Sequence, residues 1–115
     1  MSITWIVISA VILFFGASLW LKFRGDISVP AARAMVEEGA LLLDVRSPGE
    51  FAQSHLPAAK NVPVQTLGNE LASLGNKERP IVVYCASGAR SAMAARMLKQ
   101  AGFARVANLG AMSRW

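Results

Sequence analysis

The stretch PIVVYCASGARSAMAARMLKQAG, residues 80–102, decides the fold. It opens with a short apolar run that ends at Cys85, as expected of a strand buried on both faces of a parallel sheet. Four small residues follow, and from Arg90 apolar side chains recur at helical spacing up to Gly102, a typical C-terminal helix cap. The stretch therefore predicts a strand, a tight loop and a helix in succession.

Strand and helix patterns alternate on either side of this unit. The strand candidates are residues 41–45, 80–85 and 104–109. The helix candidates are residues 30–39, 47–51, 65–74 and 90–102. Ser28 and Pro30 favour the start of the first of these helices, and Gly39 favours its end. This alternation predicts an α/β fold.

Residues 1–21 contain no charged side chain, whereas all twelve Lys and Arg and all seven Asp and Glu lie beyond them. As a helix this segment would be about 31 Å long, close to the hydrocarbon thickness of about 30 Å. Trp5 and Trp20 lie near its ends, and Lys22 and Arg24 follow it. A cleaved secretory signal is the alternative, but such signals carry their basic residues ahead of the apolar stretch.

We therefore expect residues 1–21 to be one transmembrane helix that contacts the lipid bilayer, residues 22–28 a juxtamembrane joint and residues 29–115 a single α/β domain. The expected location is the inner cell membrane, with a single pass and the α/β domain on the cytoplasmic side, because basic residues follow the apolar segment.

Composition limits the partners and cofactors of this domain. The net charge is +5, but the basic residues are scattered along the sequence, so we expect no nucleic acid. One cysteine cannot form an internal disulfide, and one cysteine with one histidine cannot complete a usual zinc site, so we expect no metal. Cys85 is therefore either inert or reactive by itself.

The loop after Cys85 is typical of an anion-binding site. Such a loop turns backbone N–H groups inward, and the following helix adds partial positive charge. Gly88 permits the left-handed backbone that this curvature needs, and Arg90 would favour a nucleophilic thiolate. A buried, inert cysteine is the alternative. The candidate site residues are Cys85 as the nucleophile and Ala86, Ser87, Gly88, Ala89, Arg90 and Ser91 as the substrate-binding loop.

Four segments resemble the rhodanese superfamily, namely LLLDVRSPGEF, SHLPAAKNVP, IVVYCASGARS and NLGAMSRW. The resemblance implies a parallel five-stranded sheet flanked by helices, a transferable persulfide sulfur on Cys85 and backbone amides of residues 86–90 around it. It also implies that Arg90 binds the anionic substrate or departing sulfite, with a salt bridge at the helix start as the alternative. Ser54, Ala58 and Ala111 replace glycines of the family pattern, and we expect a short or incompletely packed last helix before Trp115.

Asp44 and Arg46 occupy the Asp-Val-Arg position of the family, at the carboxyl end of a strand. We interpret them as structural or rim residues and expect an ion pair between Arg46 and Glu50. His55 is interpreted as structural.

The combined prediction is a membrane-anchored sulfurtransferase that carries sulfane sulfur on Cys85 by a ping-pong route, without metal or organic cofactor. Its partners would be a small sulfur donor, such as thiosulfate or a polysulfide, and a thiol or protein acceptor. The loop lacks the second basic residue of several thiosulfate-using members, which argues against thiosulfate as the physiological donor. Two alternatives remain: a tethered protein-interaction module, and a small phosphatase, although phosphatases of related type place five residues between Cys and Arg where this chain has four.

Overall fold

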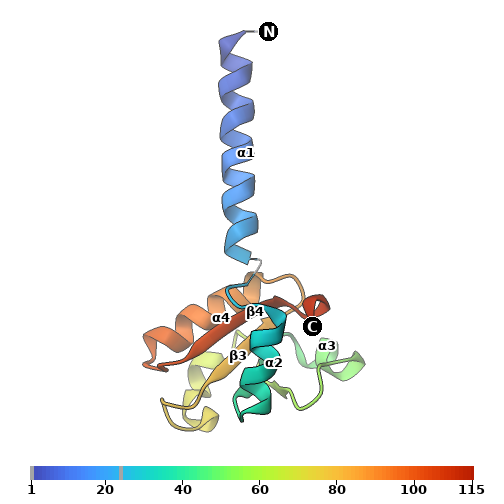
Figure 1. The fold of residues 1–115 in the computed structure, drawn as a ribbon, viewed down its shortest axis with the longest axis vertical. Coiled ribbons are helices and arrows are strands. Elements are labelled where there is room, and N and C mark those ends of the chain that lie inside the picture. The colour runs from blue at the N-terminus through green and yellow to red at the C-terminus, as the bar shows by residue number, and fades with distance from the viewer. Residues whose placement is uncertain (1, 24) are drawn as a thin grey trace.

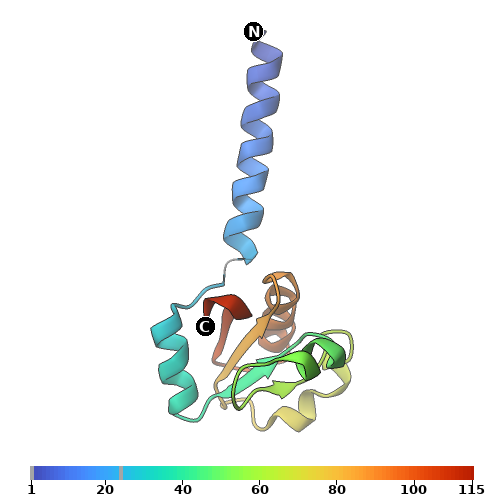
Figure 2. The same ribbon diagram turned by 90° about the vertical axis from the view of Figure 1, so that its right-hand side faces the viewer.

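The computed structural model describes residues 2–23 and 25–115, with the side chains of residues 18–23 left aside. Helix α1 (Ile3–Phe23) stands away from an α/β domain that contains all the strands (Figure 1, Figure 2). The order of elements in the domain alternates between helices and strands, which confirms the predicted α/β class.

The sheet has four strands in the order β2-β1-β3-β4, and every neighbouring pair is parallel. The strands are β1 (Leu41–Asp44), β2 (Lys60–Asn61), β3 (Ile81–Cys85) and β4 (Val106–Ala111). The family resemblance implied five strands, but the described residues form four. On the outer side of β4 the chain forms a single backbone hydrogen bond instead of a fifth strand: the Asp26 N–H donates to the Asn108 carbonyl at 2.8 Å.

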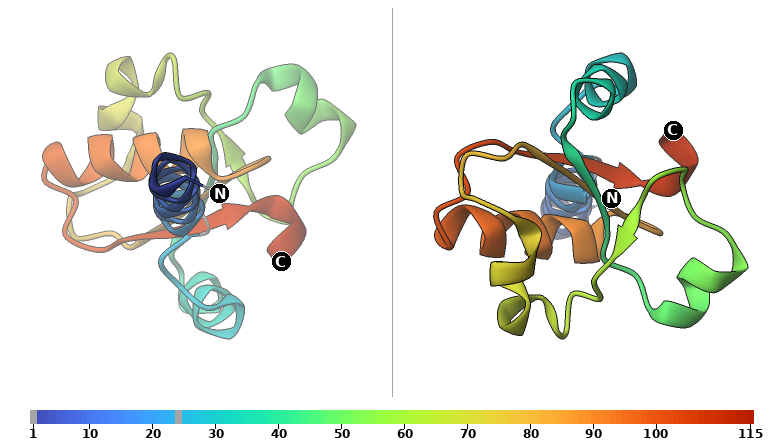
Figure 3. Two further views of the ribbon diagram at one scale, coloured as in Figure 1. Left: turned by 90° about the horizontal axis from the view of Figure 1, so that it is seen from above. Right: turned by 90° about the horizontal axis from the view of Figure 1, so that it is seen from below.

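Helices cover both faces of the sheet (Figure 3). Helix α2 (Val29–Glu37) packs on one face and α4 (Ala89–Gln100) on the other, while α3 (Pro48–Gln53) lies between β1 and β2 in the chain. Ser28 caps α2 as predicted, because its hydroxyl accepts the Ala31 N–H at 3.3 Å.

The predicted helix over residues 65–74 is wrong in type. Two short 3₁₀ turns, η1 (Leu67–Asn69) and η2 (Leu71–Leu74), take its place. Neither has a side-chain cap, but Leu67 and Leu74 are fully buried in the core beneath α4. Burial of these two leucines therefore fixes the segment without a continuous helix.

Alternation along the strands divides the core between the two faces. Leu43, Val83 and Cys85 face the α4 side, whereas Leu42 and Tyr84 face the α2 side. The last helix is a single 3₁₀ turn, η3 (Met112–Arg114), after which Trp115 packs against the α2-side cluster.

The expected membrane location is contradicted. A spanning α-helix needs about 20 consecutive, mainly apolar residues. Among the residues that the structure describes, no helix is long and apolar enough to cross a membrane. The single-pass location in the inner membrane, the cytoplasmic orientation and the bilayer as a partner of residues 1–21 are corrected accordingly. Of the flanking residues used for that prediction, Arg24 lies outside the described residues, as do the side chains of Trp20 and Lys22.

Candidate active site around Cys85

The polar residues predicted for the site meet at the carboxyl edge of the sheet. Asp44 ends β1 and Cys85 ends β3, and these neighbouring parallel strands bring their last residues to the same edge. The β3 backbone continues into a short loop, and α4 begins at Ala89. The predicted sequence of strand, tight loop and helix is confirmed, so the Cys85 sulfur lies at the start of a helix and within the core beneath it.

The Cys85 sulfur is fully buried and is held by two groups of its own loop. The Gly88 N–H donates to Sγ at 3.0 Å, and the thiol donates to the Ser91 hydroxyl at 3.4 Å. The Ser91 hydroxyl in turn donates to the Gly88 carbonyl at 3.1 Å. Gly88 has φ +104°, a left-handed conformation that L side chains rarely adopt and that turns its N–H toward the sulfur. An N–H directed at sulfur stabilises negative charge there.

Arg90 forms a bidentate ion pair with Glu50 of α3. The Arg90 Nη1 to Glu50 Oε1 distance is 2.6 Å, and Nη2 to Oε2 is 3.0 Å. The hydrogen bonds from Arg90, followed by that from the Ser47 backbone, lower the pKa of Glu50 to about 2. The hydrogen bond to Glu50, together with the Glu50 charge, raises the pKa of Arg90.

The expected ion pair between Arg46 and Glu50 is therefore wrong. Arg46 binds Asp44 instead, through its Nε at 3.1 Å from both carboxylate oxygens and its Nη2 at 2.7 Å from Oδ2. Both side chains are buried, and the remaining Nη2 contact of Arg46 is the Ser54 carbonyl at 2.7 Å. The short distance along the chain made Glu50 a plausible partner, but the Arg46 guanidinium binds Asp44 and the Ser54 carbonyl instead.

Tyr84 is a member of this buried network that the sequence analysis missed. Its hydroxyl donates to Asp44 Oδ2 at 2.7 Å and accepts the Leu56 N–H at 3.1 Å. Burial, and then the hydrogen bond to Asp44, raise the pKa of Tyr84 to about 12. A tyrosine within the otherwise apolar run IVVYC was the signal available, because a buried hydroxyl needs a partner.

His55 makes only local contacts among those that the structure describes. Its ring stacks on Phe51 with centroids 3.8 Å apart, and its Nδ1 lies 2.9 Å from the Phe51 carbonyl oxygen. Both contacts are with Phe51 of α3, which agrees with the interpretation of His55 as a structural residue.

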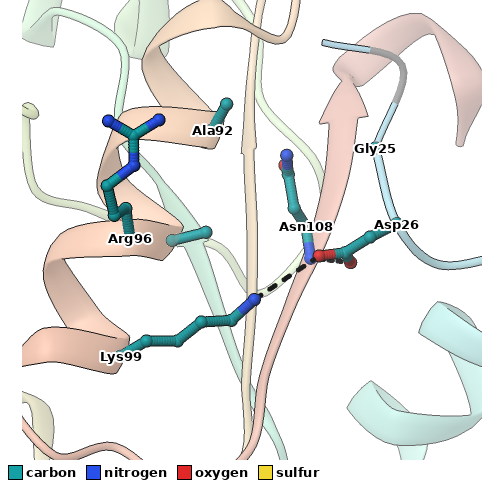
Figure 4. A pocket seen from close by; sticks show the side chains of 7 residues that line it. Gly25, Asp26, Ala92, Arg96, Lys99 and Asn108 are labelled. Atoms are coloured by element: carbon teal, nitrogen blue, oxygen red, sulfur yellow. Dashed lines mark hydrogen bonds and ion pairs between the residues drawn. The ribbon is translucent and has the colours of Figure 1, made fainter. Parts of the chain in front are cut away.

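A separate pocket of about 290 Å³ lies between α4, β4 and the residues that follow α1 (Figure 4). The Lys99 amino group lies 3.8 Å from the Asp26 carboxylate, which also accepts the Asn108 N–H, while Arg96 extends away from this pair (Figure 4). Among the described residues that line it, none comes from the Cys85 to Ser91 loop. This pocket is therefore distinct from the site around Cys85.

Comparison with known proteins agrees with this geometry. The family model described as Rhodanese-like domain matches residues 28–115. The chain belongs to this family. A protein of Allochromatium vinosum named sulfurtransferase is 40% identical over 79 residues, which cover 68% of this chain and 73% of the relative. Thiosulfate sulfurtransferase 18 of Arabidopsis thaliana is 35% identical over 98 residues, covering 74% of this chain and 72% of the relative.

Solved structures give the same result for this rhodanese-like chain. The human single-domain sulfurtransferase TSTD1 superposes with a TM-score of 0.71 at 30% identity, covering 77% of this chain and 92% of the other. Some relatives are longer, and a match in Bacillus subtilis covers 46% of that protein. The predicted enzyme class, a rhodanese-type sulfurtransferase, is confirmed by these relatives and by others named thiosulfate sulfurtransferases.

Proposed function

We propose that this chain transfers sulfane sulfur through a persulfide on Cys85. The observation that carries the proposal is the contact of 3.0 Å from the Gly88 N–H to the Cys85 sulfur at the start of α4. A thiolate in this position is stabilised by the N–H and by the helix dipole. Ser91 adds a hydroxyl 3.4 Å from the same sulfur and can rotate to donate to it when the thiol has lost its proton.

In the first half-reaction the Cys85 thiolate attacks the outer sulfur of the donor. The donor S–S bond breaks and its electron pair leaves with sulfite, if the donor is thiosulfate, or with a thiolate or shortened chain, if it is a persulfide or polysulfide. In the second half-reaction an acceptor thiolate attacks the outer sulfur of the Cys85 persulfide and releases the Cys85 thiolate. The Gly88 N–H would hold the persulfide, as would the other backbone amides of residues 86–90 according to the family resemblance, and neither half-reaction requires a metal or an organic cofactor.

The intact mass of the full-length chain tests this proposal directly. After incubation with thiosulfate or inorganic polysulfide, we expect a gain of one sulfur atom that a reductant removes. Cys85→Ser is the matched variant and should gain nothing, while its circular dichroism should match that of the original chain. Absence of a gain from every donor would refute the persulfide function.

The two alternative functions gain no specific support. A protein-interaction module would be favoured by an exposed apolar patch at Phe103 or Trp115, but Phe103 is buried and Trp115 packs on the core. A phosphatase of the related type would need Arg90 free to bind phosphate, whereas Glu50 occupies its guanidinium. Sulfur transfer is therefore the function we propose.

A further inference from the structure

The cation at the rim of the Cys85 loop is already neutralised. Arg90 is the one basic residue among residues 85–91, and both of its terminal nitrogens face the two oxygens of Glu50. The pair is about one-third exposed, so it lies at the surface of the site and within reach of an incoming donor. The Arg90 guanidinium, which would otherwise hold an oxyanion, is thus bound to a carboxylate of the same chain.

We propose that Glu50 is a positioning residue that sets donor specificity by holding Arg90 away from oxyanions. The inference rests on the proposed persulfide function of Cys85. It assigns thiol persulfides as the favoured donor class, because their leaving group is a thiolate without an oxyanion. Thiosulfate is disfavoured, because its sulfonate end must either displace Glu50 or bind without the arginine fork.

Glu50 is held in this position by its own helix. The Ser47 N–H and hydroxyl donate to Glu50 Oε1 at 3.1 and 3.0 Å, and the Glu50 N–H donates to the Ser47 hydroxyl at 3.2 Å. This reciprocal capping box orients the carboxylate at the start of α3 whether or not a donor is present. Since the pKa of Glu50 is about 2, the carboxylate also stays charged at neutral pH.

The neighbouring arginine offers no substitute for Arg90. Arg46 is 5% exposed, and its guanidinium is bound to Asp44 and to the Ser54 carbonyl. A dianionic donor at this edge would therefore meet a neutralised ion pair and no free guanidinium. A thiol persulfide carries at most one charge on its reacting end, so its binding depends less on a free guanidinium.

Transfer of sulfur to Cys85 forms and breaks the same kinds of bond with either donor. With thiosulfate, the Cys85 thiolate forms a bond to the sulfane sulfur and the electron pair of the broken S–S bond leaves with sulfite. With a thiol persulfide, the same bond forms and the electron pair leaves with the thiolate of the parent thiol. The two donors therefore differ only in the group that Arg90 could bind.

Glu50→Gln in the full-length chain tests the inference. Glutamine at this position keeps the capping box but loses the charge and one of the two acceptor oxygens facing Arg90. We measure the rate of Cys85 persulfide formation by quenched intact mass against the concentration of two probes, thiosulfate and the persulfide of 2-mercaptoethanol. We expect the ratio of thiosulfate to persulfide loading efficiency to rise about two- to fivefold, the range of one exposed charge pair.

The change should lie in binding rather than in the chemical step. We expect the half-saturating thiosulfate concentration to fall while the limiting rate stays the same, which loosening of the loop would not produce. Glu38→Gln is the matched control, because it removes an exposed carboxylate at the end of α2, outside the Cys85 loop and the Glu50 pair. An equal rise in the donor ratio with Glu38→Gln, or an unchanged ratio with Glu50→Gln, would overturn the inference.

The same experiment separates this inference from the proposed function. If the original chain gains no sulfur from either probe, the persulfide function itself fails. If it is loaded by the persulfide probe and Glu50→Gln leaves the donor ratio unchanged, the persulfide function stands and the role of Glu50 is refuted.

Discussion

Two arginine–carboxylate pairs lie at the active edge of this sheet, and they differ in burial. The pair of Asp44 and Arg46 is buried and shares a network with Tyr84, whereas the pair of Glu50 and Arg90 is about one-third exposed. Removing one member of a buried pair leaves an uncompensated charge, while an exposed pair contributes little to stability. The difference indicates that the first pair holds the edge of the sheet, while the second is the pair that we propose acts on the donor.

The largest effect is expected from Asp44→Asn, which removes the charge that compensates buried Arg46. We expect the free energy of unfolding to fall by about 3–5 kcal/mol. Urea denaturation followed by circular dichroism measures it, with Glu50→Gln as the exposed counterpart. A loss below about 1 kcal/mol, the range of exposed pairs, would contradict the distinction between the two pairs.

Tyr84→Phe should have the next largest effect. It leaves the Leu56 N–H without its acceptor and removes one donor from Asp44, at a cost of about 1–3 kcal/mol. Because the fold raises the pKa of Tyr84 from 10.0 to about 12, its contribution is fully present below pH 10 and is lost as the pH rises toward 12.

Alkaline denaturation of the two chains tests that pH dependence. The original chain should lose stability more steeply than Tyr84→Phe between pH 10 and pH 12. Parallel curves would mean that the Tyr84 hydroxyl is not coupled to folding in this way.

The sequence predicted what is local along the chain. The run up to Cys85, the small loop and the α4 helix lie within one stretch, so periodicity and Gly88 were sufficient to predict them. The Glu50 to Arg90 contact joins residues 40 positions apart and depends on how α3 approaches the loop. No pattern in the sequence reports that distance, so Glu50 was assigned to Arg46, its neighbour in the chain.

Tertiary packing, and not the sequence pattern, also determines the structure of the region between β1 and β3. Residues 65–74 carry a helical pattern, yet the burial of Leu67 and Leu74 is achieved with 3₁₀ turns. Tyr84 was counted with the apolar residues of its strand because its partner, Asp44, becomes its neighbour only through the register of β1 and β3. Tertiary contacts therefore determined the parts of the site that the sequence left open.

Ala58→Gly should raise the stability of the domain, whereas the substitutions in the buried network lower it. Ala58 has φ +68°, a left-handed conformation that costs free energy for any residue with a Cβ. It follows the segment that supplies the Ser54 carbonyl and the Leu56 N–H to the buried network. We expect the free energy of unfolding, measured by urea denaturation, to rise by about 0.5–1 kcal/mol. This figure is the relief of strain less the cost of the greater flexibility of glycine in the unfolded chain. The donor ratio of the Cys85 loading assay should not change, and a loss of stability would show that the segment is not strained.

The smallest effect on stability is expected at the exposed pair. The fold lowers the pKa of Glu50 from 4.5 to about 2, so its contribution is present above pH 4.5 and is lost as the pH falls toward 2. Because the side chain is about one-third exposed, water and salt screen the pair, and Glu50→Gln should cost about 0.5 kcal/mol at neutral pH. Acid denaturation of the two chains should converge as the pH approaches 2. A cost of several kcal/mol would place this pair with the buried one and make it a structural element. A small cost together with a large change in donor ratio would separate the two pairs, because only the exposed carboxylate would then act on the substrate more than on the fold.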